Sequence, residues 1–151
     1  MKVNKLTIVL NEQQNNLSML LEIIKNKQKA LVERDDDSIK LSVKREEKIL
    51  LKIQSLEEKR ISAIETVYTE NNLSIEDYRI TTLLQSLNSS LDKKTIEVLS
   101  DYKLNIKNLI LEIMKLNQQN MFLIQHTRQF FSETINAILS STKRSLIDRK
   151  G

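Results

Sequence analysis

The sequence predicts an all-α fold: an antiparallel three-helix coiled coil or bundle with a short extra helix and a long C-terminal helix. The 151 residues contain no proline, and the only glycine is the last residue, Gly151. A chain without these turn-forming residues favours long helices over a multi-stranded β fold. Aromatic residues make up only 4% of the chain. Leucine and isoleucine therefore supply the apolar surface, which suits a thin bundle.

The first predicted helix spans residues 3–32. Its apolar side chains recur at steps of three and four residues, which places them on one helix face. They are Leu6, Leu10, Leu17, Leu20, Ile24 and Leu31. Gln13 and Lys27 interrupt this stripe.

The second predicted helix spans residues 38–68 and runs back antiparallel to the first. Asp35 and the aspartates after it predict the turn, because aspartate and serine accept hydrogen bonds from free amides at a helix start. The apolar stripe contains Ile39, Val43, Ile49, Leu50, Ile53, Leu56, Ile64 and Val67. Glu46 and Arg60 fall at or near stripe positions.

A short helix is predicted over 75–87, between two polar breaks at 70–72 and 88–90. Ser74 and Asp77 have the spacing of a capping box, with aspartate in place of glutamate.

The last helix is predicted over 91–141. Its heptad positions are Leu99, Tyr102, Ile106, Leu109, Ile113, Leu116, Asn120, Leu123, Thr127, Phe130, Thr134 and Ala137, and half of them are polar from Asn120 onward. A second stripe then appears at Ile124, Phe131, Ile135 and Ile138. At about 1.5 Å per residue this helix would be about 75 Å long, against about 45 Å for the first two. We therefore expect an overhanging apolar end without an internal partner.

We expect one helical domain over 1–151, with a bundle over 1–140 and a flexible tail over 141–151. The chain has no cysteine, no apolar start typical of a signal peptide and no run long enough to span a membrane. These features predict a cytoplasmic protein.

No catalytic, cofactor or metal site is predicted. His126 is the only histidine, and no cysteine is available as a nucleophile. Leu123 stands where a di-iron Glu-x-x-His motif needs glutamate. The aspartates at 35–37 lack the glycine and the closing glutamate of a calcium loop.

Nucleic-acid binding and membrane insertion are not expected either. The basic end, with Lys143, Arg144, Arg149 and Lys150, is short and lacks interleaved aromatic residues. Residues 121–139 contain only Arg128 as a definite cation, whereas a membrane-surface helix needs a strongly basic polar face.

Three features together resemble the FlgN family of flagellar type III export chaperones. Ala30 and Leu31 precede the break at 35–37, which leads into a helix rich in lysine and glutamate. A polar break at 71–74 precedes the short helix. The sequence Leu-Asn-Gln-Gln-Asn at 116–120, with Asn117 and Asn120, lies inside the last helix.

The resemblance implies a three-helix antiparallel coiled coil in the cytoplasm. Such chaperones bind the C-terminal segments of the two hook-filament junction proteins before export, and they dock on the flagellar export gate. Client contact is attributed to the C-terminal helix. We expect a monomer or a small homo-oligomer.

The predicted client face consists of Leu123, Ile124, Phe130, Phe131, Ile135, Ile138 and Leu139. An amphipathic client segment would pack on it as a helix. The alternative for Phe130 is a core position against the first two helices. A seam asparagine sets register or oligomer state, and we favour that role for Asn120. For Asn117, a hydrogen bond to a client backbone stays open.

Two other functions stay open. One is a structural coiled-coil scaffold, which would bury the same face in an oligomer. The other is a related export chaperone whose client is the filament cap protein.

Overall fold

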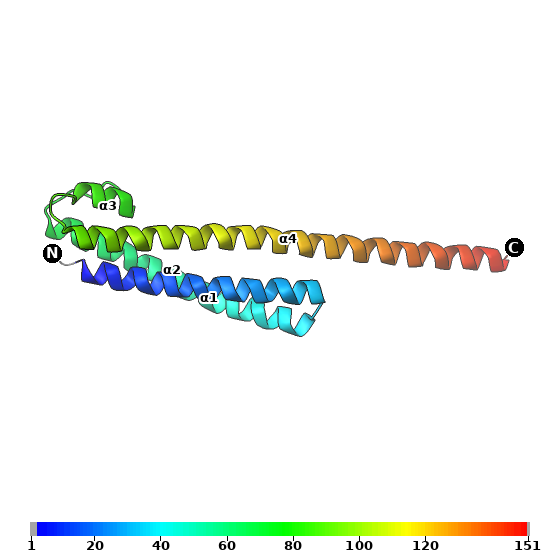
Figure 1. The fold of residues 1–151 in the computed structure, drawn as a ribbon. Coiled ribbons are helices and arrows are strands. Elements are labelled where there is room, and N and C mark those ends of the chain that lie inside the picture. Colours follow the sequence, from blue (N-terminus) through cyan, green and yellow to red (C-terminus); the bar gives the residue numbers. More distant parts are fainter. Residues whose placement is uncertain (1–2, 151) are drawn as a thin grey trace.

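The computed structural model describes residues 3–150, apart from the side chains of Thr127, Phe130, Phe131 and residues 141–150. Helix α1 (Asn4–Glu33) is followed by α2 (Asp36–Glu70), the short α3 (Ile80–Ser86) and the long α4 (Lys93–Lys150). The predicted all-α bundle is confirmed. Figure 1 shows α1, α2 and α4 side by side and α3 near the start of α4.

The three long helices run up, down and up, so α2 is antiparallel to both α1 and α4 (Figure 1). Helix α1 is central, because it packs closely along both α2 and α4. Helices α2 and α4 are not closely packed against each other. One seam of the bundle therefore stays open, and this opening matters for the surfaces described below.

The turn between α1 and α2 lies at the predicted aspartates, but α2 begins at Asp36 rather than at 38. Arg34 ends α1 in the left-handed conformation, with φ of 55°. The Asp35 carboxylate accepts hydrogen bonds from the Ser38 backbone N–H at 3.2 Å and the Ser38 hydroxyl at 2.6 Å. Asp35 therefore caps α2, and these bonds hold the pKa of its carboxyl below the ordinary value.

The segment before α3 differs from the prediction. Residues 73–79 are not helical, and α3 begins at Ile80 rather than at 75. The Asp77 carboxylate accepts hydrogen bonds from the Arg79 backbone N–H at 2.9 Å and from the Thr82 hydroxyl at 3.0 Å. An aspartate that binds the N–H two residues ahead forms a local turn instead of a capping box.

Both ends of α4 also differ from the prediction. The helix begins at Lys93 rather than at Leu91, because Asp92 accepts a hydrogen bond from the Thr95 backbone N–H at 3.3 Å and caps it. It continues to Lys150, past the predicted end at 141, with no proline or internal glycine to stop it. The side chains of residues 141–150 lie outside the described part of the chain, so the predicted flexible tail stays a prediction.

The core consists of two apolar clusters along the bundle. One joins α1, α2, α3 and the start of α4 around Leu6, Ile64, Tyr68, Leu83 and Leu99. The other lies nearer the α1–α2 turn and contains Leu17, Leu20, Leu21, Ile24, Ile49 and Ile113. Most of the stripe predicted on the first helix is buried in these clusters, as expected.

Helix α4 extends far beyond its partners. Three hydrogen bonds join α1 to α4 at a constant separation of 91 residues: Asn11 to Tyr102, Gln14 to Asn105 and Gln28 to Gln119. The same separation places Ile124 of α4 beside Glu33, the last residue of α1. Helix α4 therefore passes the end of α1 near Ile124. The remaining part of α4, residues 125–150, is named the overhang (Figure 1). It is about 40 Å long at the helical rise of about 1.5 Å per residue.

Candidate partner-binding surface

The predicted client face lies where α4 leaves the bundle and along the overhang. Leu123 and Ile124 are half-buried at the point where α4 leaves α1. Ile135, Ile138 and Leu139 are exposed, with 57% of Leu139 accessible. The side chains of Phe130 and Phe131 lie outside the described part of the chain, so their roles stay predictions.

A second apolar stripe runs along α4 and begins well inside the bundle. Its positions are three or four residues apart: Ile106, Ile110, Met114, Asn117, Met121 and Ile124. Ile110, Met114 and Met121 are exposed. At the same spacing the stripe continues through Arg128 to Ile135 and Leu139. The predicted overhang face is thus the last part of a longer stripe.

The first half of this stripe was not predicted from the sequence. The predicted second stripe begins at Ile124, because Ile106 also belongs to the heptad that packs on α1. The spacing of Ile110, Met114 and Met121, which lie off that heptad, could have indicated the first half of the stripe. Phe122 was also missed. It is exposed and stacks on His126, with ring centroids 5.8 Å apart.

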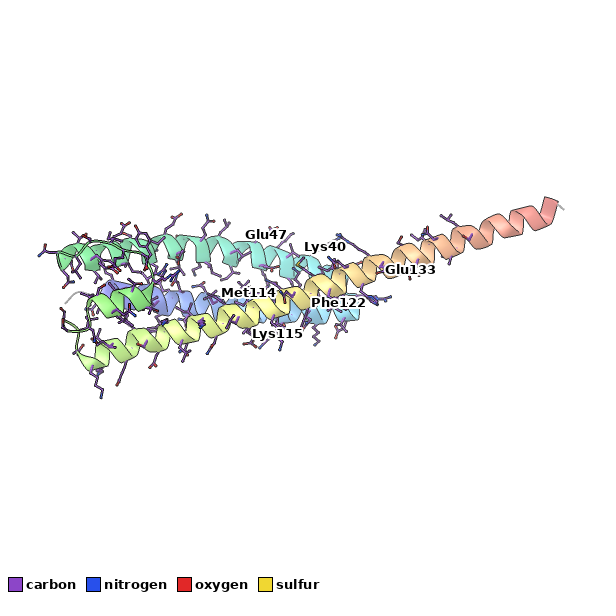
Figure 2. All side chains as sticks on the ribbon, turned by 90° about the horizontal axis from the view of Figure 1, so that it is seen from above. Lys40, Glu47, Met114, Lys115, Phe122 and Glu133 are labelled. Atoms are coloured by element: carbon purple, nitrogen blue, oxygen red, sulfur yellow. The ribbon has the colours of Figure 1, made fainter. Side chains whose placement is uncertain are left out.

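Inside the bundle, this stripe forms one wall of a groove between α2 and α4. The groove has a volume of about 480 Å³. Leu10, Gln13 and Leu17 of α1 line it, together with Ile53, Glu57 and Arg60 of α2, Arg79, Ile80 and Thr81 at the start of α3, and Lys103, Ile106, Lys107, Ile110 and Leu111 of α4. Figure 2 looks onto this side of the molecule, with α2 and α4 apart, α1 behind them and α3 at one end.

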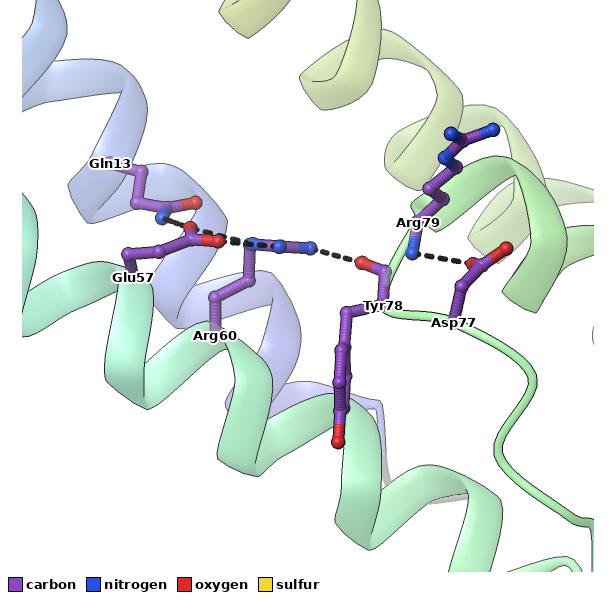
Figure 3. Close-up of polar contacts among 6 residues, drawn as sticks. All are labelled: Gln13, Glu57, Arg60, Asp77, Tyr78 and Arg79. Atoms are coloured by element: carbon purple, nitrogen blue, oxygen red, sulfur yellow. Dashed lines mark hydrogen bonds and ion pairs between the residues drawn. The ribbon is translucent and has the colours of Figure 1, made fainter.

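A polar network connects residues that line the groove with the segment before α3 (Figure 3). Gln13 donates to the Glu57 carboxylate at 2.9 Å. Arg60 donates to both oxygens of Glu57, at 2.8 and 2.6 Å, and also to the backbone carbonyl of Tyr78. The bonds from Arg60, the largest cause, hold the pKa of the Glu57 carboxyl below its ordinary value. The network joins α1, α2 and the segment before α3.

The polar residues that interrupt the predicted stripes are therefore paired. Besides Gln13 with Glu57, Lys27 of α1 forms an ion pair with Glu46 of α2 at 3.0 Å, and both side chains are largely buried. Each pair places a polar residue of one helix opposite a polar residue of the other. Buried polar groups cost free energy unless they are paired, so these contacts favour one register of the α1–α2 hairpin.

Asn120 is the last fully buried residue along α4 among the described side chains. It is 2% exposed, and its side-chain amide donates to the backbone carbonyl of Ile24 at 3.3 Å. Asn117, one turn earlier, is half-buried and occupies a polar position in the second stripe. The register role of Asn120 and the open role of Asn117 stay predictions.

The described part of the chain has no cluster of metal-binding side chains. No group of three histidine, cysteine, aspartate or glutamate side chains among the described residues could hold a metal ion. His126 is exposed on α4, beside Phe122. None of the described helices is long and apolar enough to cross a membrane.

The fold and its surfaces define a helical binding protein that presents apolar helix faces. The comparison with protein families assigns it more closely: the chain belongs to the FlgN family, whose model, described as FlgN protein, matches residues 1–150. Neither a curated protein nor a solved structure matches the chain. Membership implies a flagellar export chaperone, which is not an enzyme and whose partners are hook-associated proteins.

Proposed function

We propose that this protein is a cytoplasmic export chaperone that holds the C-terminal segments of the hook-filament junction proteins on the overhang of α4. The observation that carries the proposal is the row of exposed apolar residues, Ile135, Ile138 and Leu139, beyond the end of α1. Membership of the FlgN family supports this class of client. The flagellar export gate is the second proposed partner, and a monomer or small homo-oligomer is the proposed state.

The physical basis is the pairing of two amphipathic helices. A junction-protein segment with an apolar stripe would aggregate or pair early if it stayed free. On the overhang and the two residues just before it, the segment can fold as a helix and bury its stripe against Leu123, Ile124, Phe130, Phe131, Ile135, Ile138 and Leu139. Each buried leucine or phenylalanine contributes roughly 1.5–3 kcal/mol, partly offset by the cost of ordering the segment.

The test is titration calorimetry with the C-terminal segments of both junction proteins. We expect Ile135→Asp with Leu139→Asp to weaken binding more than about a hundredfold, since two anchors are lost and two charges desolvated. Phe130→Ala with Phe131→Ala should abolish binding while the helix content stays unchanged. Leu104→Asp is the matched control, because Leu104 is exposed on α4 but lies on neither the overhang nor the groove. Equal affinity of the overhang variants and the wild type would remove the site assignment.

Two alternatives make different predictions in the same experiments. A structural scaffold would self-associate through the overhang, so light scattering would report a large assembly that Ile135→Asp dissociates. A chaperone for the filament cap protein would bind the cap segment more tightly than either junction-protein segment.

A further inference from the structure

The groove between α2 and α4 has the chemistry of a second binding site. Its floor contains Leu10 and Leu17 of α1, with Gln13 between them bonded to Glu57, and its walls carry Ile53 of α2 and Ile106 of α4. Ile110 and Leu111 remain 42% and 54% exposed at the α4 edge. Apolar side chains of this size are normally covered where helices pack, and here α3 reaches only one end of the groove (Figure 2).

The charges along the groove have predominantly one sign. Lys103 and Lys107 line the α4 wall, and Arg79 lies at the α3 end. The only carboxylate among the lining residues is Glu57, which is already bonded to Arg60 and Gln13. No ion pair engages Lys103 or Lys107 within the described part of the chain. An occupant of this groove therefore gains most when its flanks are acidic.

The same charges argue against the basic C-terminal end of the chain as the occupant. Residues 141–150 contain Lys143, Arg144, Arg149 and Lys150 against a single acid, Asp148. This end is as basic as the groove wall, so it would be repelled whether it came from the same chain or from a second copy. In addition, α4 carries this end away from the groove as a continuous helix (Figure 1).

We propose that the groove between α2 and α4 binds an amphipathic helix of another protein, one whose apolar stripe is flanked by glutamate or aspartate. The stripe would enter between Ile53 and Ile110, and the acidic flank would face Lys103 and Lys107. Helix-in-groove recognition of this kind uses apolar anchors at three- and four-residue spacing. This site is separate from the overhang and does not depend on the client proposed above.

The first test uses two synthetic helical peptides and the full chain. Both peptides carry leucine at three- and four-residue spacing; one has glutamate at every flanking position and the other has lysine. In fluorescence anisotropy we expect the glutamate peptide to bind about tenfold more tightly than the lysine peptide at low salt, and the difference to shrink as salt rises. Absence of binding by the glutamate peptide, or equal binding of both peptides, would overturn the proposal.

The second test places the peptide on the molecule. Lys103→Glu with Lys107→Glu should weaken the glutamate peptide about tenfold and strengthen the lysine peptide. Ile110→Asp should weaken both. These side chains are exposed, so the fold should persist, which circular dichroism checks. Leu104→Asp, and Ile135→Asp with Leu139→Asp, should change neither affinity.

The outcomes separate this site from the overhang. If the overhang variant loses the glutamate peptide while the groove variants keep it, the groove site is wrong and the overhang is the general site for amphipathic helices. If the groove variants lose the peptide but keep the junction-protein segments, both sites stand as assigned.

Discussion

The part of α4 inside the bundle and the overhang both carry apolar residues at helical spacing, but their surroundings differ. Within the bundle, its apolar residues pack on α1, and Leu99 and Ile113 are buried. In the overhang, Ile135 and Leu139 repeat at the same helical spacing, yet both are exposed. A helix stripe is therefore a core element or a binding surface according to whether another helix runs beside it. In this chain, the end of α1 at Glu33 separates the two cases.

The largest expected effect tests this difference through stability. Leu99→Ala removes a side chain with no exposed surface from the core around α3. It should lower the free energy of unfolding by about 2–5 kcal/mol. Leu139→Ala, which removes the same atoms from a side chain that is 57% exposed, should change it by less than about 0.5 kcal/mol. Urea unfolding followed by circular dichroism measures both. Similar losses in the two variants would mean that the overhang is packed like the bundle.

A smaller effect is expected at the Lys27–Glu46 ion pair, whose side chains are largely buried. Glu46→Ala leaves the Lys27 ammonium without its partner, so we expect a loss of about 1–3 kcal/mol. Replacing both residues, by Lys27→Met with Glu46→Leu, should restore most of that loss because no charge remains buried. A double variant no more stable than Glu46→Ala would show that packing, not the lone charge, sets the cost.

The network at Glu57 should make stability depend on pH. The hydrogen bonds from Arg60 lower the folded-state pKa of this carboxyl below its ordinary value of 4.5. Between the folded-state and unfolded-state pKa values, the unfolded chain therefore binds more protons than the folded chain. The stabilisation is then present above the unfolded-state pKa and is lost as pH falls through the folded-state pKa. Glu57→Gln should cost about 1 kcal/mol at neutral pH, an amount reduced by solvent screening of this partly exposed carboxylate.

The measurement is thermal unfolding of the wild type and Glu57→Gln between neutral and acid pH. The two stability curves should converge on the acid side, where Glu57 itself becomes protonated. A constant difference at every pH would show that Glu57 contributes through packing and not through its charge. Binding of junction-protein segments to the overhang should be unaffected, since Glu57 lies in the bundle.

The smallest effect is expected at Tyr68, which is fully buried in the core near α3. No described residue offers its hydroxyl a hydrogen-bond partner. Tyr68→Phe should therefore raise the free energy of unfolding by up to about 1 kcal/mol, because an unsatisfied polar group leaves the core. A destabilised variant would indicate that the hydroxyl is satisfied in solution.

The long helices and the overhang could be predicted because their causes are local. Leu6, Leu10 and Ile24 recur at helical spacing, and Asp35 caps the helix that follows it. The start of α3 could not be predicted, because Asp77 has two local bonding patterns and the structure uses the turn to Arg79. Sequence spacing alone does not decide between the two patterns.

The pairs across the bundle and the groove required the structure. Gln13 and Lys27 could be recognised as interruptions, but their partners Glu57 and Glu46 depend on the register of two helices joined by a turn. The groove depends on α2 and α4 staying apart, which no residue pattern along a single helix encodes. The apolar repeat through Ile110 can be seen in the sequence, but without the packing of α2 and α4 it does not indicate a groove.

Hydrogen exchange with and without a bound junction-protein segment would show whether the client lies on the overhang. Amides of residues 125–140 have no neighbouring helix in the free protein and should exchange faster than those of 99–120. On addition of a saturating segment, residues 125–140 should gain the most protection while the bundle changes little. Binding without added protection over 125–140, or with protection confined to the bundle, would contradict the assignment of the overhang as the client site.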